Sequence, residues 1–484
     1  MVFGDDVQLF YKLYNWGFLM VLLREFSLPF NPDRAVKLNR GRQNNRISVL
    51  LGINGTQKSS ILRGILEGAL FAASASDVTS NMKRSLECNA KWHAAVPDKV
   101  IAISSAATDR FPSKTSFGEG GFFTKYDIPK YTYVGPRTGR NIVSRAQSVQ
   151  SLLSEFLQTA SISPSVGKFI DRLSVKTSVP FTITLRLKRR QFDPGRIRPP
   201  RASSLSTFLA ETGANPHLTR SSRWTKLVEE AKKDRALMKE STRFFDLLNT
   251  EEFKRGIEIE IDLRSSGYVG LPQIDPRAIH FGLIVGFVKL SDIEFRAPGL
   301  PPVHPDTFSA GQWGLFSSLT TAALGVRDRT LLLIDEPENA LHPSWQREYL
   351  AELRLAFSHC KNCHIIIATH SPLIVSGLGA KEADLIGLRL ANDRSVVPAP
   401  LEVPMGWQVT DVLEDIFDLP STRSPGVVSD IETAMKLITK GVDQNIVALR
   451  KVAKRLTTLL NSLPEDDVAR QVISSICRIS GVTD

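Results

Sequence analysis

Hydrophobic residues fall into continuous runs at some places in this chain and into helical repeats at others. The runs "TLLLIDEP" (Thr330–Pro337) and "HIIIATHSP" (His364–Pro372) are apolar until they end in polar residues. Strands that are buried on both faces of a parallel sheet have this pattern, because both of their sides contact apolar layers. We therefore expect two central strands of a parallel sheet here.

A third strand is expected ahead of a glycine-containing turn. Residues Arg46–Leu51 are β-prone, residues 52–57 contain two glycines, and "SSILRGILEGALFAA" follows. In this last stretch the apolar positions recur at helical spacing, at Ile61, Leu62, Ile65, Leu66 and Leu70. The predicted order is strand, glycine loop, helix.

Other stretches divide the remainder of the chain. Residues 99–105, 180–187 and 257–263 have strand patterns, and Trp16–Leu23 is interpreted as an early core strand. Pro, Ser, Arg and Thr become frequent from about Gly195 to Pro216, a charged helical stretch follows at Trp224–Asn249, and the pattern is helical after about Met405. We expect an N-terminal lobe (1–189), a basic and helical insertion (190–255), a C-terminal lobe (256–404) and a helical C-terminal region (405–484).

Composition restricts the class of protein and its partners. The chain has 484 residues, of which 42% are hydrophobic and 23% are charged, as in ordinary globular proteins, and no apolar run is as long as a membrane span. Four cysteines in this length favour a reducing cytoplasm. The net charge of +11 favours an anionic partner such as DNA or RNA. Basic residues concentrate at Arg186–Arg201, which is either a solvated flexible loop or a phosphate-contacting patch.

The glycine turn is the first candidate site. "GINGTQKSS" (Gly52–Ser60) follows the phosphate-binding pattern G-x-x-x-x-G-K-[ST], except that Gln57 stands where glycine is expected. Backbone N–H groups at such a turn can hold phosphate, while Lys58 can reach the β- and γ-phosphates and Ser59 can hold Mg²⁺. The candidate nucleotide-binding residues are Gly52, Asn54, Gly55, Thr56, Gln57, Lys58, Ser59 and Ser60. The alternative is a plain strand–turn–helix unit.

Acidic residues end the first apolar run, and a histidine ends the second. Asp335 can bind Mg²⁺ directly or through water, and Glu336 can polarise an attacking water molecule. Two acids at the mouth of an apolar strand are costly unless a cation or water meets them. The alternative is a strand that ends at the surface. His370 is either a structural histidine or a contact to a γ-phosphate.

A second helix start lies between these segments. In "DTFSAGQWGLFSSL" (Asp306–Leu319), Ser309 precedes an apolar helix and predicts a helix N-terminus with an exposed hydroxyl and free N–H groups. Gly311 and Gln312 belong to the same candidate site. The alternative is an ordinary N-cap serine.

The order and spacing of these motifs resemble the ATP-binding-cassette (ABC) class of ATPases, in its SMC/RecF/OLD branch. "DEPENALHP" followed by "ATHSP" is especially similar to the OLD and RecF group. The resemblance implies an α/β fold: an ABC-type P-loop ATPase head with two lobes, a helical and basic insertion, and a helical C-terminal region. It also implies ATP and Mg²⁺ as cofactors.

The resemblance assigns a role to each candidate residue. Gly52–Ser59 matches Walker A, Asp335 and Glu336 match Walker B with Glu336 as catalytic carboxylate, and His370 matches the switch histidine. Ser309–Gln312 matches the signature motif, which completes the ATP site of a partner subunit, and Asn339–His342 matches the D-loop. The Q-loop is not placed, and Arg137 and Gln147 are its candidates. Because Gln57 departs from the pattern, we expect ATP binding with slow hydrolysis.

The C-terminal stretch "GWQVTDVLEDIFDLPSTRSP" (Gly406–Pro425) is similar to ATPase subunits of bacterial anti-phage systems of the Septu (PtuA-like) type, which act with a separate HNH nuclease. This implies a homo-oligomeric, cytoplasmic ATPase that scaffolds or controls an effector nuclease. The alternative is a RecF-like repair or recombination ATPase that binds DNA directly. A nuclease in its own right needs a further carboxylate cluster, and the sequence shows none outside the Asp335 region.

Overall fold

The computed structural model describes most of the chain in two compact units, Met1–Gly406 and Trp407–Asp484. The described residues are 23–28, 31–38, 45–71, 90–92, 96–106, 108–114, 117, 124–138, 143–159, 161–190, 204–214, 222–251, 253, 255–265, 268–270, 274–379, 383–391, 395–401, 406–415, 417, 419 and 421–482. Nearly all of Trp16–Leu23, the expected early strand, lies outside them.

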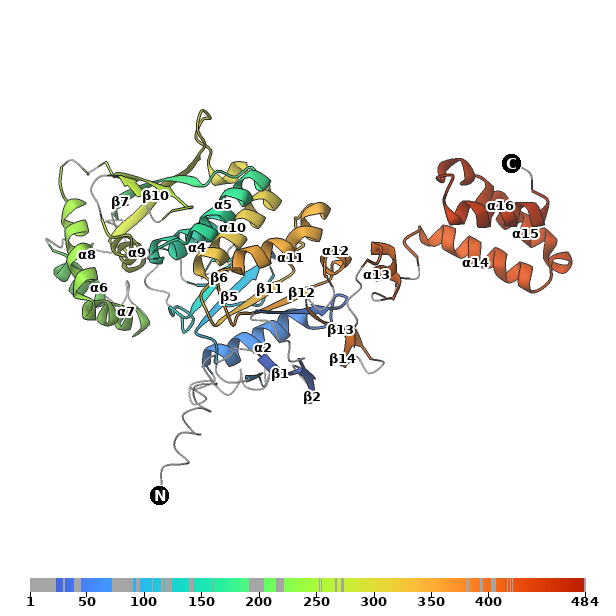
Figure 1. The fold of residues 1–484 in the computed structure, drawn as a ribbon, viewed down its shortest axis with the longest axis horizontal. Helices are drawn as coiled ribbons and strands as arrows, with labels where there is room; N and C mark the ends of the chain where they lie inside the picture. Colours follow the sequence, from blue (N-terminus) through green and yellow to red (C-terminus); the bar gives the residue numbers. More distant parts are fainter. Residues whose placement is uncertain are drawn as a thin grey trace, which may run out of the picture. The chain divides into compact units, whose positions relative to one another are not determined.

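The centre of the first unit is a large, mostly parallel sheet (Figure 1). Among the described residues its seven strands have the order β14-β13-β3-β12-β11-β5-β6. Their bounds are β3 Arg46–Leu51, β5 Lys99–Ser104, β6 Tyr131–Val134, β11 Thr330–Asp335, β12 His364–Thr369, β13 Asp384–Leu390 and β14 Val396–Leu401. Among the described strand pairs of this sheet, β13–β14 is antiparallel and the others are parallel. The predicted α/β fold with a parallel sheet is confirmed.

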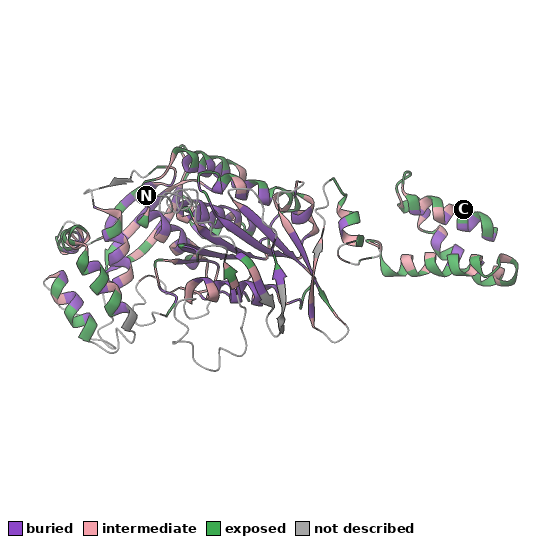
Figure 2. Cartoon of the chain, turned by 60° about the horizontal axis from the view of Figure 1, so that its bottom comes forward, coloured by how far each residue is buried: buried purple, intermediate pink, exposed green. Residues whose placement is uncertain are grey.

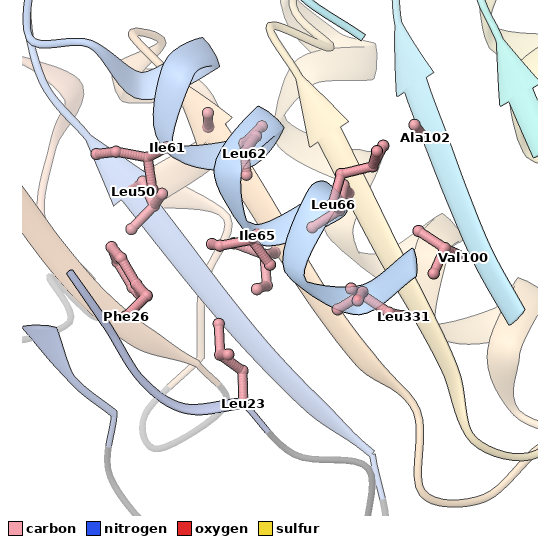
Figure 3. Packing of buried hydrophobic residues seen from close by; sticks show 14 of the residues in the cluster. Leu23, Phe26, Leu50, Ile61, Leu62, Ile65, Leu66, Val100, Ala102 and Leu331 are labelled. Atoms are coloured by element: carbon pink, nitrogen blue, oxygen red, sulfur yellow. The ribbon is translucent and has the colours of Figure 1, made fainter. Parts of the chain in front are cut away.

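The strands predicted from continuous apolar runs are buried along their whole length. Every residue of β3, β11 and β12 is buried, and these three strands are direct neighbours (Figure 2). Helix α2 (Lys58–Phe71) follows β3 after the glycine turn and packs its apolar side chains on the sheet. Figure 3 shows this cluster around α2, with Leu50, Ile61, Leu62, Ile65, Leu66, Val100, Ala102 and Leu331 among its members.

Helices cover the sheet on the side away from α2 (Figure 1). They are α4 (Arg145–Gln158), α5 (Pro164–Thr177), α10 (Ala310–Gly325) and α11 (Pro343–Phe357), with the short α12 (Pro372–Ser376) after β12. The 3₁₀ turn η2 (Pro305–Thr307) precedes α10. Among the described helices there is none whose length and apolar character would suffice for a membrane crossing.

Two smaller antiparallel sheets complete the first unit. One has the order β2-β1-β4, formed by β1 (Leu23–Leu28), β2 (Asn31–Lys37) and β4 (Ala90–Trp92). The other has the order β10-β7-β8-β9, formed by β7 (Thr182–Arg189), β8 (Ile257–Asp262), β9 (Tyr268–Gly270) and β10 (Val288–Arg296). The sequence predicts β7 and β8 by their alternation, and the structure pairs them side by side.

Helices α6 (Leu205–Ala214), α7 (Ser222–Lys233) and α8 (Arg235–Leu247) lie between β7 and β8 in the sequence, and α9 (Pro276–Val285) follows β9. The stretch predicted as helical at Trp224–Asn249 is divided at Asp234. The Asp234 carboxylate accepts a hydrogen bond from the Leu237 backbone N–H at 3.0 Å. Asp234 is therefore the N-cap of α8 and lies between the end of α7 and the start of α8.

The second unit is helical. It contains α13 (Val409–Asp415), α14 (Pro425–Thr439), α15 (Val442–Thr457), the turn η3 (Leu460–Ser462) and α16 (Val468–Ser480). The sequence pattern places Leu449, Val452, Leu456, Leu459 and Leu460 on one face. All of them except Leu459 are buried in the core of this unit, and Leu459 packs against it partly buried. Side chains of α14 and α16 pack on this face. The unit therefore has a hydrophobic core of its own.

Candidate nucleotide-binding site

The carboxyl ends of three neighbouring strands meet at one edge of the central sheet. Ala368 pairs with Asp335 of β11, and Thr369 pairs with Leu51 of β3. The glycine turn, Asp335–Glu336 and His370 follow these positions directly. Strand register therefore brings the glycine turn together with two motifs that follow it far along the chain, at the sheet edge where α/β folds place ligands.

The turn after β3 has the backbone geometry that glycine permits at two positions. A Cβ atom on Gly52 would lie 2.7 Å from the Leu388 carbonyl oxygen, so this position has no room for a side chain. Gly55 has φ of +90°, in the left-handed region. Gln57 also has a positive φ, 61°, although it is not a glycine. The glutamine thus adopts the left-handed conformation that the expected glycine would adopt.

The other residues of the turn occupy distinct positions. Asn54 is exposed, whereas Ser60 is buried in the first turn of α2. The Thr56 hydroxyl is buried and donates a hydrogen bond to the Ile53 carbonyl at 2.8 Å, which stabilises the turn from within.

Lys58 lies at the start of α2 with a buried side chain. Its Nζ donates to two carbonyl oxygens of the preceding turn, at 2.7 and 3.2 Å. Burial lowers the pKa of the Lys58 ammonium, and the carboxylates of Glu336, Asp335 and Glu338 partly oppose this shift. The lysine therefore lies within electrostatic reach of the acids that follow β11.

Asp335 is only 2% exposed at the end of β11. Burial raises its pKa to about 7, and the Ser59 hydroxyl partly opposes the shift by hydrogen bonding to the carboxylate. Its Oδ1 atom is buried and has no hydrogen-bond partner within the described part of the chain. A buried carboxylate oxygen without a partner, next to a serine hydroxyl, is a donor set that fits Mg²⁺.

Glu336 begins the turn that leaves the sheet. Its backbone N–H donates to the Ala368 carbonyl at 2.9 Å, and its φ is 48°, so the backbone turns sharply here. The Asn339 amide donates to Glu336 Oε2 at 3.1 Å. The side chain remains partly exposed, which leaves the carboxylate accessible to water.

His370 lies beside two carboxylates. Its Nδ1 is 3.2 Å from Glu338 Oε1 and 3.8 Å from Glu336 Oε1. No sequence motif marks Glu338, although this residue is buried within the site. The only sequence signal for it is a further acid directly after the Asp-Glu-Pro run, and its burial depends on tertiary packing.

Ser309 is the N-cap of α10 and forms a capping box with Gln312. The Ser309 hydroxyl accepts from the Gln312 N–H at 3.2 Å, and the Gln312 side chain accepts from the Ser309 N–H at 2.9 Å. The expectation of an exposed hydroxyl and free N–H groups is therefore wrong only for the N–H groups of Ser309 and Gln312, which are hydrogen-bonded. Ser309 is exposed, but these groups satisfy one another. None of the described hydrogen bonds joins Ser309 to residues 52–60 or to Asp335.

Gly311 connects α10 to the turn after β11. A Cβ atom at this position would lie 2.5 Å from the Ala340 carbonyl oxygen. Ala340 itself has φ of 65°. The signature-like helix and the D-loop-like turn therefore contact each other closely, and only glycine fits at the contact.

The Q-loop candidates occupy different surroundings. The Arg137 guanidinium pairs with Asp109 at 2.5 Å, in the loop after β5, while Gln147 is buried on α4. Asp109 contributes to the raised pKa of Asp335, so its charge is felt at the site. Asp109 is a second acid near the site that could not be predicted, because no sequence motif marks it.

The basic segment Arg186–Arg201 is described only up to Arg190. Residues 186–189 belong to β7, so this part is a strand and not a flexible loop. Arg186 forms ion pairs with Glu258 at 2.5 Å and with Asp292 at 3.2 Å. The remaining arginines of the segment, Arg196, Arg198 and Arg201, lie outside the described residues.

Comparison with known proteins supports the interpretation of the motifs. A family model described as "AAA domain, putative AbiEii toxin, Type IV TA system" matches residues 167–376, a range that contains β11 and β12 but not the glycine turn. The Septu protein PtuA of Bacillus thuringiensis is 32% identical over 120 residues, which are 24% of this chain and 29% of that protein. The retron Vc95 probable ATPase of Vibrio cholerae serotype O1 biovar El Tor is 26% identical over 113 residues, 23% of this chain and 21% of that protein.

The matched part thus spans less than a third of either relative's length. A Pyrococcus furiosus Smc head domain bound to the C-terminal domain of ScpA has a TM-score of 0.30 and 10% identity, over 83% of this chain and 100% of that one. So low a TM-score carries no argument about this fold. The motif order, the parallel sheet and the family match over residues 167–376 together resemble those of ABC-class AAA-type ATPases.

Proposed function

We propose that this chain binds Mg²⁺–ATP at the carboxyl edge of the central sheet and hydrolyses it slowly. The observation that supports this proposal most directly is Asp335, whose buried Oδ1 has no partner among the described residues while Lys58 and Ser59 lie nearby. Such a carboxylate is costly alone and is stabilised by a divalent cation.

Each residue of the site has a proposed role. The turn Gly52–Ser60 holds the phosphates through backbone N–H groups and Lys58. Ser59 and Asp335 hold Mg²⁺, which when bound neutralises charge on the phosphate oxygens. Glu336 accepts a proton from the attacking water, and His370 contacts the γ-phosphate. Gln57 retains the left-handed backbone but adds a side chain beside the phosphates, which is the reason to expect slow turnover.

We further propose that the ATP site is completed by Ser309 of a second copy of the chain. The exposure of Ser309 at the start of α10 supports this, as does the lack of any described hydrogen bond from Ser309 to residues 52–60. The turn at Ala340, which contacts Gly311, could transmit the state of one site to the next.

Mixing two inactive variants tests this arrangement. Lys58→Ala removes the phosphate-binding lysine, and Ser309→Arg blocks the signature position. If ATP is shared, a heterodimer of the two variants contains one site with both wild-type residues, so the mixture regains part of the ATPase rate. Absence of recovery, with both variants folded and wild-type ATPase measurable, would contradict a shared site. Glu336→Gln should trap the ATP-bound dimer, which light scattering detects.

The relatives suggest the biological setting. Because the matched relatives are a Septu protein and a retron ATPase, we propose that the chain is the ATPase subunit of a bacterial anti-phage defence complex. In this proposal it scaffolds or controls a separate effector nuclease, of HNH type, through the helical region 405–484 or the insertion 190–255. A pull-down from the native host with Glu336→Gln and ATP should recover a nuclease. A chain truncated after residue 404 tests which region holds it.

The second candidate is a RecF-like ATPase that binds DNA directly, and the net charge of +11 favours it. The described part of the basic segment does not strengthen it, because Glu258 and Asp292 already neutralise Arg186. The test is duplex binding at several salt concentrations with Arg196, Arg198 and Arg201 changed to Glu. Steeply salt-dependent binding that is lost in the variant would favour this candidate.

A further inference from the structure

Glu338 joins the ends of the two strands that form the site. Its side chain is only 5% exposed, in the turn that leaves β11. Its Oε1 accepts hydrogen bonds from the Thr369 hydroxyl at 2.8 Å and from the His370 backbone N–H at 2.7 Å. One carboxylate oxygen therefore fixes the backbone at the end of β12 with groups that belong to the switch histidine segment.

The same oxygen faces the imidazole ring of His370. Glu338 Oε1 lies 3.2 Å from His370 Nδ1, closer than Glu336 Oε1 at 3.8 Å. At this distance the pair lacks hydrogen-bond geometry, so Nδ1 is buried without a hydrogen-bond partner among the described residues. The side chain is 38% exposed although its Nδ1 atom is buried, so the exposed part of the ring lies away from Nδ1. Because the two ring nitrogens lie on different edges of the imidazole, an Nδ1 directed at Glu338 leaves Nε2 available.

The negative charge of Glu338 also acts on Lys58 in the proposed phosphate-binding turn. It is one of the carboxylates that oppose the lowered pKa of Lys58. Its second oxygen, Oε2, is buried without a hydrogen-bond partner within the described part of the chain. A buried carboxylate with an unpaired oxygen destabilises the fold unless a positive or polar group lies beside it. The His370 ring is the side chain next to this carboxylate.

We propose that Glu338 is a positioning residue that accepts the Nδ1–H of His370 and presents Nε2 to the γ-phosphate. This rests on the proposed ATPase function. By occupying the histidine, Glu338 also leaves the Glu336 carboxylate free to act on water. The two glutamates of "DEPENALHP" thus have different roles. Glu336 acts on the attacking water, and Glu338 orients His370.

The rival explanation is that Glu338 only ties two segments together, and the chain offers a control for it. The Gln346 side chain of α11 accepts from the Ser371 hydroxyl at 2.7 Å and donates to the Leu341 carbonyl at 3.0 Å. It also donates to the Glu338 backbone carbonyl at 3.5 Å, and none of its described hydrogen bonds reaches the Glu338 carboxylate or the His370 ring. Gln346→Met should therefore lower stability but leave the ATPase rate per folded molecule unchanged.

The first readout needs neither nucleotide nor activity. In the full chain labelled with ¹⁵N-histidine, NMR should show His370 as the Nδ1–H tautomer, with the signal assigned by its loss in His370→Asn. In Glu338→Gln the negative charge is removed, and the Nε2–H tautomer should gain population. An Nε2–H tautomer in the wild-type chain, or an unchanged tautomer in both the wild type and Glu338→Gln, would overturn the inference.

The second readout is a double-mutant cycle on ATP hydrolysis. Loss of one charge-assisted hydrogen bond predicts that Glu338→Gln lowers kcat about ten- to a hundredfold, with little change in the KM for ATP. If Glu338 acts through His370, the double variant with His370→Ala is no slower than His370→Ala alone. Multiplicative losses would overturn the inference. A wild-type chain that does not bind ATP would refute the proposed function instead, and the tautomer measurement would still decide the role of Glu338.

Discussion

Gln57 shows how one residue can depart from a motif while its backbone conforms. Its φ is 61°, in the left-handed region. A residue with a Cβ atom destabilises the folded chain by about 1–2 kcal/mol in this conformation, whereas glycine adopts it freely. Glycine also makes the unfolded chain more flexible, at a cost of about 0.5–1 kcal/mol. We therefore expect Gln57→Gly to leave the free energy of unfolding equal or higher by up to about 1 kcal/mol, and to raise the affinity for ATP. Denaturant titration and nucleotide titration measure the two effects.

Gln57→Val is the matched variant, because a β-branched side chain tolerates the left-handed conformation poorly. It should be less stable than Gln57→Gly by more than about 1 kcal/mol. Equal stability of the two variants would show that the backbone at this position relaxes, and that the left-handed turn is not required.

At the scale of elements, helix α10 contains two glycines with different surroundings. Gly311 at its start leaves no room for a side chain, whereas Gly314 leaves room for one. Gly311→Ala would place a Cβ atom 2.5 Å from the Ala340 carbonyl, so α10 or the turn after β11 must move. We expect a loss of stability of about 1–3 kcal/mol and a clear loss of ATP-dependent dimerisation. Thermal unfolding and light scattering with ATP are the measurements.

Gly314 in the same helix provides the control. A Cβ atom there meets no atom within 4 Å, so Gly314→Ala should stabilise the protein by about 0.5–1 kcal/mol through helix propensity alone. If Gly311→Ala dimerised with ATP as well as Gly314→Ala does, the contact between α10 and Ala340 would have no part in assembly.

The elements that the sequence predicts best are those whose burial is complete. β3, β11 and β12 are buried on both faces, so their apolar runs are unbroken, and α2 has a regular apolar face. β10 is not predicted, because a register shift between Leu290 and Asp292 interrupts its alternation. β4 is only three residues long and carries too little pattern to recognise.

For the candidate site too, the residues that could be predicted are those next to a recognisable sequence pattern. The glycine turn, Asp335 and His370 could be predicted because each directly follows a recognisable strand or run. Glu338 and Asp109 could not, because an acid in a loop is usually exposed, and their burial comes from segments distant in sequence. The capping box of Ser309 was also not foreseen, although a glutamine at the third helical position is its usual signature.

At the scale of the whole molecule, buried ionisable groups oppose one another in their effect on stability. Burial raises the pKa of Asp335 to about 7, so its contribution to stability is present at low pH and is lost as the pH rises through that value. Burial lowers the pKa of His280 and of His364 to about 3. Their contribution has the opposite sign, since it is present above the ordinary histidine pKa and is lost as the pH falls. The measured pH dependence of the wild type is a sum of such terms, and only differences between variants isolate one residue.

His280 gives the cleanest such difference. It lies half-buried on α9 against α4, where its Nε2 shares a hydrogen bond with the Ser154 hydroxyl at 2.9 Å. Below about pH 6.5 the unfolded chain protonates this residue and the folded chain does not, so stability falls by up to about 1.4 kcal/mol per pH unit. His280→Gln removes the titrating group and should therefore flatten the dependence between pH 7 and pH 5, whatever its effect at pH 7. Ser154→Ala removes the hydrogen bond but keeps the histidine, and should retain the wild-type slope. Urea unfolding at several pH values compares the three proteins. Parallel curves for wild type and His280→Gln would show that His280 takes up its proton equally in the folded and unfolded chains, contrary to this prediction.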